Sequence, residues 1–377
     1  MKIGIVCYPT FGGSGVLATE LGKALADKNH HVHFITYQQP VRLNEFIPNI
    51  YYHEVQVPPY PLFDYPPYET ALASTLVDVI KNNHLDLLHV HYAIPHAAAA
   101  YMAKKILEQE GIHIPVITTL HGTDITLVGR DKMYAPVVAF SINESDAITA
   151  VSYNLRDETY KTFKIEKNIE VIHNFVDVER FKRKPIDAFK KVIAPEGERI
   201  LLHASNFRKI KRVEDVVKIF HNVQQQIPSK LLFVGDGPER ATAEYLSRQL
   251  GVCDDIRFVG KQEQMEDILA IGDLFLLTSE YESFGLAALE AMAAGIPVVS
   301  TNAGGLPEIM VNGVTGYMGD VGDVETMSEQ AISILQDEEQ LVQFKKNAYE
   351  HALKFDIHNI VPQYEKLYDE ILSKEYA

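Results

Sequence analysis

Short apolar runs alternate with stretches of helical periodicity along most of the chain, and this alternation restricts the fold more than any other feature. In the first half, runs that predict strands occupy residues 3–7, 31–36, 86–90, 116–120 and 147–151. Stretches with helical spacing lie between them, for example at residues 69–81 and 97–109. Strands that alternate with helices predict a parallel sheet with helices on both faces.

The same alternation starts again after residues 181–195, a charged stretch with two prolines that is typical of a linker. Further strands are predicted at residues 200–204, 231–234, 256–259, 274–277 and 297–301, with helices at 213–226 and 241–250. A chain of 377 residues is also too long for one hydrophobic core. We therefore predict two α/β domains of the doubly wound, Rossmann-like type, an N-terminal domain over residues 1–182 and a C-terminal domain over residues 183–355.

The end of the chain is helical in pattern, at residues 323–335, 338–353 and 357–373. We predict that the last helix, within residues 356–377, crosses back to cover the N-terminal domain. Ligands of open parallel sheets bind beyond the carboxyl ends of the strands. Two such domains facing each other across a cleft would therefore place the active site in that cleft.

The charge and the cysteine count exclude several classes of function. The formal net charge of −16 disfavours nucleic acid as a partner, so an anionic ligand needs a local positive site. The two cysteines, Cys7 and Cys253, imply no disulfide framework, and an apolar strand pattern predicts that Cys7 is buried. The sequence shows no signal-peptide pattern and no apolar run long enough to span a membrane, so we expect a cytoplasmic protein without stable membrane insertion.

A glycine-rich segment, Gly12-Gly13-Ser14-Gly15, follows the first strand and opens a helix. Small residues let a phosphate group approach the backbone N–H groups at a helix N-terminus. A simple tight turn explains the segment equally well. It is neither a Walker loop nor a complete G-x-G-x-x-G motif, and no acidic residue follows the second strand, which disfavours an NAD site.

Three histidines lie at or just beyond predicted strand ends. His121 is followed by Gly122 and Asp124, where it could bond a sugar hydroxyl or form a structural hydrogen bond. His89 and His91 flank Val90, but no third residue of metal-ligand spacing follows. We therefore predict that these two line a polar wall of the cleft.

Four cations lie between Asn206 and Arg212, beyond another predicted strand end. In so acidic a chain, this cluster suits the diphosphate of a nucleotide, whose charge grows as it leaves. The alternative is a solvated basic face. We expect one or two of the four to point into the cleft.

Glu282 and Glu290 lie on either side of a predicted helix start at residues 283–285. Free N–H groups there could hold a phosphate, Glu282 could accept bonds from sugar hydroxyls, and Glu290 could reach a ribose diol. By spacing alone, an ordinary capped helix with two solvated glutamates explains the segment as well.

Together these segments resemble the GT4 family of retaining glycosyltransferases, which has the GT-B fold. The resemblance covers nearly the whole chain and rests on five motifs in the family's order. They are residues 234–238, 258–260, the Glu-x7-Glu block at 282–290, residues 294–299 and residues 303–309. The family uses nucleotide sugars, so the resemblance implies a hexosyltransferase with a UDP-sugar substrate, no cofactor and no required metal ion.

The resemblance also implies roles for individual residues. Glu290 would bind the ribose, Glu282 the hydroxyls of the donor sugar, Lys211 the diphosphate and His121 the 6-hydroxyl of that sugar. Asn206 stands where the family usually has Arg, and Arg208 is a candidate to supply the missing charge. The remaining donor contacts implied are Gly13 and Ser14 at the diphosphate, Gly260 and Lys261 at the base, and Phe284, Gly285 and Leu286 at phosphate or sugar.

Within the family, the segments at residues 7–15, 90–96, 119–126 and 205–212 look most like members that begin bacillithiol biosynthesis. That likeness implies UDP-GlcNAc as donor and L-malate as acceptor. A dicarboxylate needs cations or N–H donors on the N-terminal domain, and the candidates are Tyr92, Thr123, Arg130 and Lys132. Alternatives are a GT4 transferase with another acceptor, a UDP-GlcNAc 2-epimerase on the same fold, and a module that binds nucleotide sugars without turnover. A homo-oligomer stays open.

Overall fold

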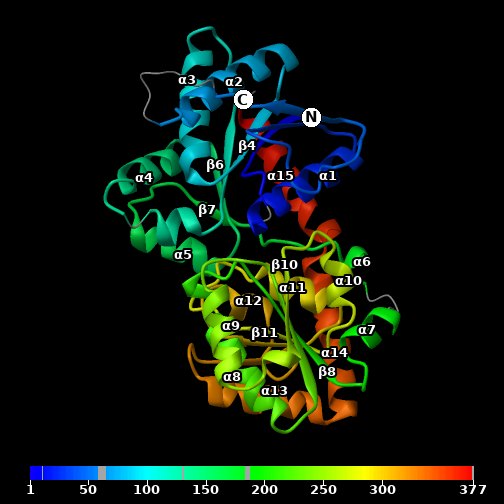
Figure 1. Cartoon of the computed structure of the whole chain (residues 1–377). Coiled ribbons are helices and arrows are strands. Elements are labelled where there is room, and N and C mark those ends of the chain that lie inside the picture. Colours follow the sequence, from blue (N-terminus) through cyan, green and yellow to red (C-terminus); the bar gives the residue numbers. More distant parts are fainter. Residues whose placement is uncertain (11, 58–64, 130, 183–186, 376–377) are drawn as a thin grey trace. The chain divides into compact units, whose positions relative to one another are not determined.

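The named strands form two sheets, and within each sheet all neighbouring strands are parallel (Figure 1). The computed structural model describes residues 1–10, 12–57, 65–129, 131–182 and 187–375. It divides into two compact units, each with one sheet. Unit 1 comprises Met1–Asn174 and Ile357–Ala377, and unit 2 comprises Phe175–Asp356.

The sheet of unit 1 has seven strands in the order β3-β2-β1-β4-β5-β6-β7. The order reverses between β1 and β4, as in doubly wound folds. The strands are β1 (Lys2–Val6), β2 (His31–Thr36), β3 (Ile50–Glu54), β4 (Leu87–His91), β5 (Val116–Leu120), β6 (Ala147–Ala150) and β7 (Ile169–Val171). The helices are α1 (Gly13–Asp27), α2 (Tyr68–Asn83), α3 (Ala98–Glu108), α4 (Ala135–Glu144), α5 (Tyr153–Thr162) and α15 (Ile357–Glu375).

The C-terminal helix α15 belongs to unit 1, where it packs against α1. Tyr368 is fully buried, and its hydroxyl lies 2.7 Å from Nδ1 of His89 on β4. Glu365 of the same helix accepts from Lys28 at 2.5 Å, just after α1. The last residues of the chain therefore complete the core of the unit in which the chain begins.

The sheet of unit 2 has six strands in the order β10-β9-β8-β11-β12-β13, which reverses between β8 and β11. The strands are β8 (Arg199–Ala204), β9 (Ser229–Val234), β10 (Ile256–Gly260), β11 (Leu274–Leu277), β12 (Val298–Thr301) and β13 (Gly316–Gly319). The helices are α6 (Val178–Phe181), α7 (Asp187–Ile193), α8 (Val213–Gln224), α9 (Arg240–Gln249), α10 (Met265–Leu269), α11 (Leu286–Ala293), α12 (Leu306–Ile309), α13 (Val324–Gln336) and α14 (Glu338–Ala352).

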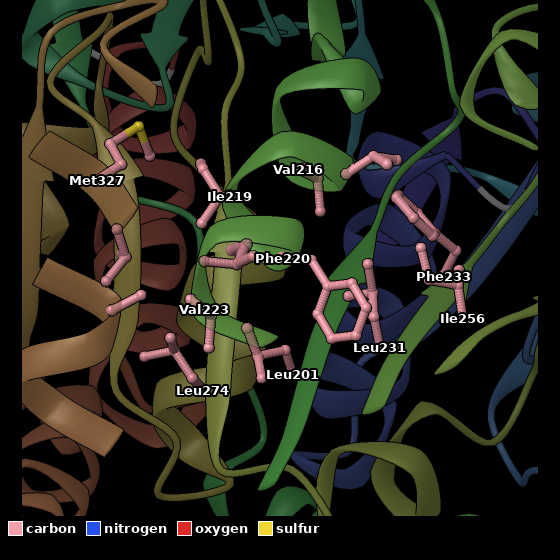
Figure 2. Close-up of a cluster of buried hydrophobic side chains, with 14 of the residues drawn as sticks. Leu201, Val216, Ile219, Phe220, Val223, Leu231, Phe233, Ile256, Leu274 and Met327 are labelled. Carbon is pink, nitrogen blue, oxygen red and sulfur yellow. The ribbon is translucent and has the colours of Figure 1, made fainter. Parts of the chain in front are cut away.

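Helix α8 supplies much of the core of unit 2. Its apolar side chains recur every three or four residues, so they form one stripe that faces the sheet. Figure 2 shows Phe220 and Val223 of this stripe beside Leu201 of β8 and Leu231 of β9. This packing fixes the position of β8, and the cationic segment follows the end of that strand.

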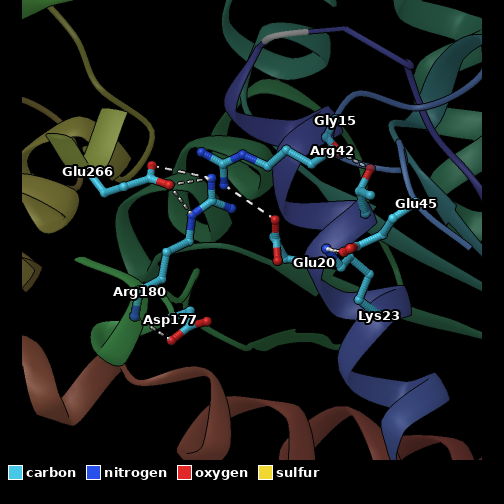
Figure 3. Close-up of polar contacts among 9 residues, drawn as sticks. Gly15, Glu20, Lys23, Arg42, Glu45, Asp177, Arg180 and Glu266 are labelled. Carbon is cyan, nitrogen blue, oxygen red and sulfur yellow. Dashed lines mark hydrogen bonds and ion pairs between the residues drawn. The ribbon is translucent and has the colours of Figure 1, made fainter. Parts of the chain in front are cut away.

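The boundary between the units differs from the prediction. We expected the first domain to reach residue 182, but residues 175–182 lie with unit 2 because α6 packs against α10 and α11. Arg180 of α6 lies 3.3 Å from Glu266 of α10, and Asp177 caps α6 by accepting from the Arg180 N–H (Figure 3). The predicted linker is also partly wrong, since α7 occupies residues 187–193 of it.

The sequence pattern missed three strands: β3, β7 and β13. Strand β3 is a largely exposed edge strand, so it lacks an apolar run. Strand β7 has only three residues, and β13 begins and ends with glycine. These strands are stabilised by pairing with a neighbour rather than by their own composition.

Candidate active site

Several of the residues predicted to hold a nucleotide sugar lie at the switch points of the two sheets. In unit 2, the loop with Lys211 follows β8 and the loop with Glu282 follows β11, which are neighbours in the sheet. In unit 1, the loop with Ser14 follows β1 and Tyr92 follows β4, again on neighbouring strands. In an open parallel sheet the strands diverge at this point and leave a crevice for ligands.

In unit 2, Lys211 and Glu282 form an ion pair with Nζ and Oε1 2.5 Å apart. Both side chains are mostly buried. The Ser279 hydroxyl donates to the same carboxylate oxygen at 2.7 Å. Charge-assisted hydrogen bonds of this kind are short and directional, so they fix the position of the Lys211 ammonium.

The backbone of the cationic loop is held by the loop after β11. The Thr278 hydroxyl lies 3.0 Å from the carbonyl oxygens of both Lys211 and Arg212. The Glu280 N–H donates to the carbonyl oxygen of Ile210 at 2.8 Å. Lys211 therefore lies at the end of a short 3-10 turn, Lys209–Lys211, that is anchored on both sides.

A buried histidine fixes the start of the same loop. His203 of β8 lies 2.9 Å from the Leu276 carbonyl through Nδ1 and 2.8 Å from the Ser205 hydroxyl through Nε2. A carbonyl only accepts, so Nδ1 carries the proton and the hydroxyl donates to Nε2. Burial lowers the pKa of His203 to about 4, so the ring is neutral at pH 7. Ser205 Oγ in turn accepts from the Phe207 N–H at 3.3 Å.

The four cations of this segment have different surroundings. Arg212 pairs with two carboxylates, Asp215 at 2.6 Å and Glu280 at 3.3 Å, whereas Lys211 pairs with Glu282 alone. Arg208 and Lys209 are exposed, as is Asn206, and the described residues offer neither cation an ion pair. Lys211 is thus held in place, whereas Arg208 stays accessible to an anion.

The predicted helix start after Glu282 lies at Leu286, where α11 begins with Gly285 at its N-cap. Gly285 has φ +99°, and a Cβ there would lie 2.5 Å from Leu306 Cδ2, so both conformation and space require glycine. Phe284 is buried against Phe355, with ring centroids 5.9 Å apart. Glu290 lies on α11 and is half-buried. The N-terminus of α11 therefore lies four residues after Glu282 in the chain.

The motif at residues 303–305 is explained by close backbone contact with the Glu282 loop. A Cβ on Gly304 would lie 2.0 Å from the Glu282 carbonyl oxygen, and one on Gly305 would lie 2.5 Å from the Ser283 carbonyl oxygen. The Gly305 N–H donates to the Glu282 carbonyl at 2.7 Å. The two glycines therefore let one loop hold the backbone of the other.

Gly260 and Lys261, the predicted contacts to the base, end strand β10 in the same unit. Gly260 has φ +70°, and its carbonyl accepts from the Gly235 N–H at 2.8 Å. The turn at Gly235 in turn lies against the Ser205 backbone, where a Cβ would come within 1.9 Å of a carbonyl oxygen. Lys261 is exposed.

In unit 1, four predicted residues come together. The Tyr92 hydroxyl donates to Ser14 Oγ at 2.7 Å, and Thr123 lies close to Tyr92. The ring of His121 lies 5.1 Å from that of Tyr92. Helix α1 begins at Gly13, next to Ser14, and has no side-chain cap. Of the other predicted acceptor contacts, Lys132 is exposed and Arg130 lies outside the described residues.

Asp124, a residue not predicted to act in the site, joins the two loops of this group. Its carboxylate accepts from the Ala93 N–H after β4 and from the Gly122 N–H after β5, both at 3.0 Å. Burial raises its pKa to about 6, against the opposing effect of these N–H groups. The bonds secure Tyr92 at φ +83°, a backbone conformation that is strained for tyrosine.

The prediction that His89 and His91 line a polar cleft wall is wrong. Both are buried, with 0% and 2% of their surface exposed. The rings of His89, His91 and His121 stack in series, with centroids 4.6 Å and 5.1 Å apart. Burial lowers the pKa of His89 and of His121 to about 3 and that of His91 well below its usual value. Cys7 is buried, as predicted.

Sequence analysis also overlooked Ser279 and His203, which hold the cationic loop through other residues. Each lies at or near a strand end beside a residue that was recognised, and that proximity is the only signal the sequence offers. Within the described ranges, no group of three or more His, Cys, Asp or Glu side chains could hold a metal ion. Nor is any helix in those ranges both long and apolar enough to cross a bilayer.

Comparison with known proteins gives two family matches that together span most of the chain. A family model described as Glycosyltransferase Family 4 matches residues 11–180, and one described as Glycosyl transferases group 1 matches residues 186–351. The chain is 48% identical to the N-acetyl-alpha-D-glucosaminyl L-malate synthase of Bacillus anthracis over 375 residues, which is 99% of this chain and 97% of that protein. It is 24% identical to the D-inositol 3-phosphate glycosyltransferase of Thermobispora bispora, covering 96% of this chain and 91% of the other.

Solved structures show the same two-sheet architecture. Sucrose-phosphate synthase from Thermosynechococcus elongatus superimposes with a TM-score of 0.80 at 22% identity over 99% of this chain and 100% of the other. Anabaena HepE in complex with UDP and glucose gives a TM-score of 0.82 at 20% identity over 97% of this chain and 99% of the other. At these identities the likeness shows the fold, which is GT-B.

Proposed function

Because this chain belongs to the family 4 glycosyltransferases, we propose that it transfers N-acetylglucosamine from UDP-GlcNAc to the hydroxyl group of L-malate, with retention of the α configuration. This reaction would be the first step of bacillithiol biosynthesis. The observation that carries the proposal is the 48% identity, over 99% of the chain, to a bacterial enzyme named for this product. The site residues supply groups that suit both substrates.

The donor is assigned to unit 2. Lys211 lies beyond β8 with its ammonium fixed by Glu282 and Ser279, and Arg208 is exposed in the same loop. A cation whose position is fixed before the reaction stabilises the negative charge that appears on a departing diphosphate. It does not have to reorganise during the reaction. Glu282 is assigned to the hydroxyls of the sugar and Glu290, on α11, to the ribose.

The acceptor is assigned to unit 1, where the Tyr92 hydroxyl donates to Ser14 and Thr123 lies close to Tyr92. Lys132, which is exposed, is assigned to a carboxylate of malate, and Arg130 is assigned the same role. His121 is assigned to the sugar of the donor. The diphosphate contacts of Gly13 and Ser14 at the start of α1 complete the assignment.

The chemical step proposed is a transfer on one face of the sugar. The bond from the anomeric carbon to the β-phosphate oxygen breaks, and the malate hydroxyl oxygen forms a new bond to that carbon from the same side. The proton of the malate hydroxyl passes to the leaving phosphate oxygen. The products are UDP and an α-linked GlcNAc-malate, and no protein nucleophile takes part.

The proposal includes no metal ion, because Lys211, Arg208 and the helix N-termini would carry out the charge stabilisation that a divalent ion provides elsewhere. It also places the reaction in the cytoplasm, where the nucleotide sugar is made. It does not depend on the oligomeric state.

The decisive experiment is an assay of UDP release from UDP-GlcNAc with and without L-malate, followed by mass spectrometry and NMR of the product. Malate-dependent release with an α-linked GlcNAc-malate supports the proposal. Release that depends on another acceptor keeps the enzyme class and overturns malate. Conversion of the donor alone to its 2-epimer, or binding without turnover, overturns the transferase reaction itself. Activity that is lost with EDTA and restored by a divalent ion overturns the metal-free mechanism.

A further inference from the structure

His91 and His121 form a direct hydrogen bond between two imidazole rings. His91 is the last residue of β4, and His121 follows β5, the next strand in the sheet. Nδ1 of His91 lies 2.8 Å from Nε2 of His121. The bond leaves His121 with one ring nitrogen, Nδ1, that His91 does not occupy.

Only one of the two bonded nitrogens can carry the proton. Both rings are neutral at pH 7, because burial lowers the pKa of each. Either His91 donates from Nδ1–H to Nε2 of His121, or His121 donates from Nε2–H to Nδ1 of His91. In the first arrangement the second proton of the pair lies on Nδ1 of His121, and in the second it lies on Nε2 of His91. The surroundings of these two outer nitrogens therefore decide between the arrangements.

The outer nitrogen of His91 decides in favour of the first arrangement. Nε2 of His91 is buried, and no described residue provides it with a hydrogen-bond partner. If His121 were the donor, His91 would carry its proton on Nε2, and a buried N–H group would be left without an acceptor. Such orphaned N–H donors are rare in proteins, whereas an unused lone pair is tolerated more often.

His96 shows the same preference in the same core. Its Nδ1 lies 2.5 Å from the carbonyl oxygen of His91, and since a carbonyl only accepts, His96 donates from Nδ1–H. Its Nε2 is then a lone pair, and this atom too is buried without a partner among the described residues. In both histidines the buried outer nitrogen is therefore an unprotonated one.

We propose that His91 is a positioning residue that fixes His121 in the Nδ1–H tautomer, so that His121 presents a hydrogen-bond donor to an oxygen of the substrate. His121 keeps part of its surface exposed, unlike His91. Its outer nitrogen, Nδ1, then carries a proton and no available lone pair, so at this atom His121 donates and does not act as a base. The identity of the oxygen, a hydroxyl of the donor sugar, rests on the proposed function, whereas the tautomer does not.

Consequently, the proton of the malate hydroxyl cannot transfer to Nδ1 of His121, because that nitrogen is already protonated. This agrees with a transfer in which the leaving phosphate oxygen takes that proton. The same hydrogen bond gives His91 a role beyond packing, because a side chain that only filled space could not select a tautomer of His121.

The test is an NMR measurement of the ring nitrogens in the full-length protein labelled with ¹⁵N-histidine. Long-range ¹H–¹⁵N spectra distinguish protonated from unprotonated ring nitrogens, and the H91N and H121N variants assign the two residues. We expect a protonated Nδ1 and an unprotonated Nε2 in both. A protonated Nε2 in His121 overturns the proposal. This readout needs no turnover, so it stands or fails separately from the proposed reaction.

Two matched variants then test the effect on the reaction. In H91N the side-chain amide N–H replaces the Nδ1 donor, whereas in H91L a side chain of similar shape offers none. We expect H91N to retain the His121 Nδ1–H signal and most of kcat/KM for UDP-GlcNAc, and H91L to lose about five- to tenfold in kcat/KM, the effect of one hydrogen bond. Equal activity of the two folded variants overturns the positioning role. If H91L does not fold, the spectrum of H91N decides, because loss of the His121 Nδ1–H signal there overturns it.

Discussion

The ammonium nitrogen of Lys211 lies 2.5 Å from Oε1 of Glu282, so the side chains assigned to the diphosphate and to the sugar are held together as one ion pair. Ser279 donates to the same oxygen and Thr278 holds the backbone of Lys211, so both partners of the pair are fixed by their neighbours. The pair therefore acts as one preorganised unit, and the first prediction concerns its cation.

Replacing Lys211 by Ala should lower kcat about 100- to 1000-fold, which is the usual effect of removing one fixed donor from a developing negative charge. KM for L-malate should change much less, because Lys211 is assigned to the donor. Steady-state kinetics with UDP-GlcNAc and L-malate measure both. Lys209→Ala is the matched control, since Lys209 lies two residues away and is exposed. Unchanged kcat in K211A would remove Lys211 from the mechanism.

Gly304→Ala should destabilise unit 2 by about 3 kcal/mol, because it adds backbone strain at φ +64° to a clash with the Glu282 carbonyl oxygen. Gly313→Ala is the control, with φ +75° but no atom near its Cβ, and should cost only about 1 kcal/mol. Urea unfolding measures both. Since the clash displaces Glu282, G304A should also weaken UDP-GlcNAc binding in calorimetry. Equal losses in the two variants would show that close contact is unimportant.

Stability should fall as the pH decreases from about 6.5, because buried histidines are neutral in the folded chain and take up protons when it unfolds. Burial lowers the pKa of His89 to about 3, below its unfolded value, so its contribution is present above pH 6.5 and is lost towards pH 3. Between its folded and unfolded pKa values, each such histidine changes the free energy of unfolding by about 1.4 kcal/mol per pH unit. His89→Gln should reduce the slope of the unfolding free energy between pH 6 and 4 by about that amount, as urea titrations at each pH would show.

His113→Gln is the control for this measurement, because His113 is exposed. Its slope should match that of the unaltered protein. An equal change in slope in both variants would mean that burial of His89 is not the source of the pH dependence.

Tyr92→Phe and Ser14→Ala should each raise KM for L-malate, because each removes one end of the 2.7 Å hydrogen bond that holds Tyr92, the residue assigned to the acceptor. Ser14→Ala should also raise KM for UDP-GlcNAc, since Ser14 is assigned to the diphosphate. The double variant should lose less than the sum of the two, with a coupling of about 1 kcal/mol. Initial rates over a range of malate concentrations provide the four values of the cycle. Strict additivity would indicate that the two hydroxyls act separately.

Strands with apolar runs could be predicted from the sequence, and strands stabilised only by pairing could not. The predicted bounds of β2, β5 and β11 agree with the structure residue for residue, because each is a short, mostly buried run. Strand β13 contains two glycines and gave no such signal. The boundary at residue 182 was misplaced because α6 packs against α10 and α11 and pairs with Glu266, 86 residues later in the chain.

For the site, the sequence identified the residues that carry charge or a rare motif, such as Lys211 and Glu282. It did not identify those that act through distant partners. Asp124 bonds an N–H group 31 residues away, and His203 bonds a carbonyl 73 residues away. Nothing in the local sequence of either residue distinguishes it from a solvated or core side chain, since its role follows from which loops the parallel sheet brings together.

The placement of α15 sets an order of assembly during synthesis. The ribosome completes Phe175–Asp356 as one continuous segment, so unit 2 has its whole sequence while unit 1 still lacks Ile357–Ala377. Until Tyr368 emerges, His89 has no hydroxyl beside its Nδ1, and α1 lacks its contact with α15. The unit whose sequence is translated first is therefore the unit that can mature last, and a chain arrested near its end would carry a finished unit 2 beside an open unit 1.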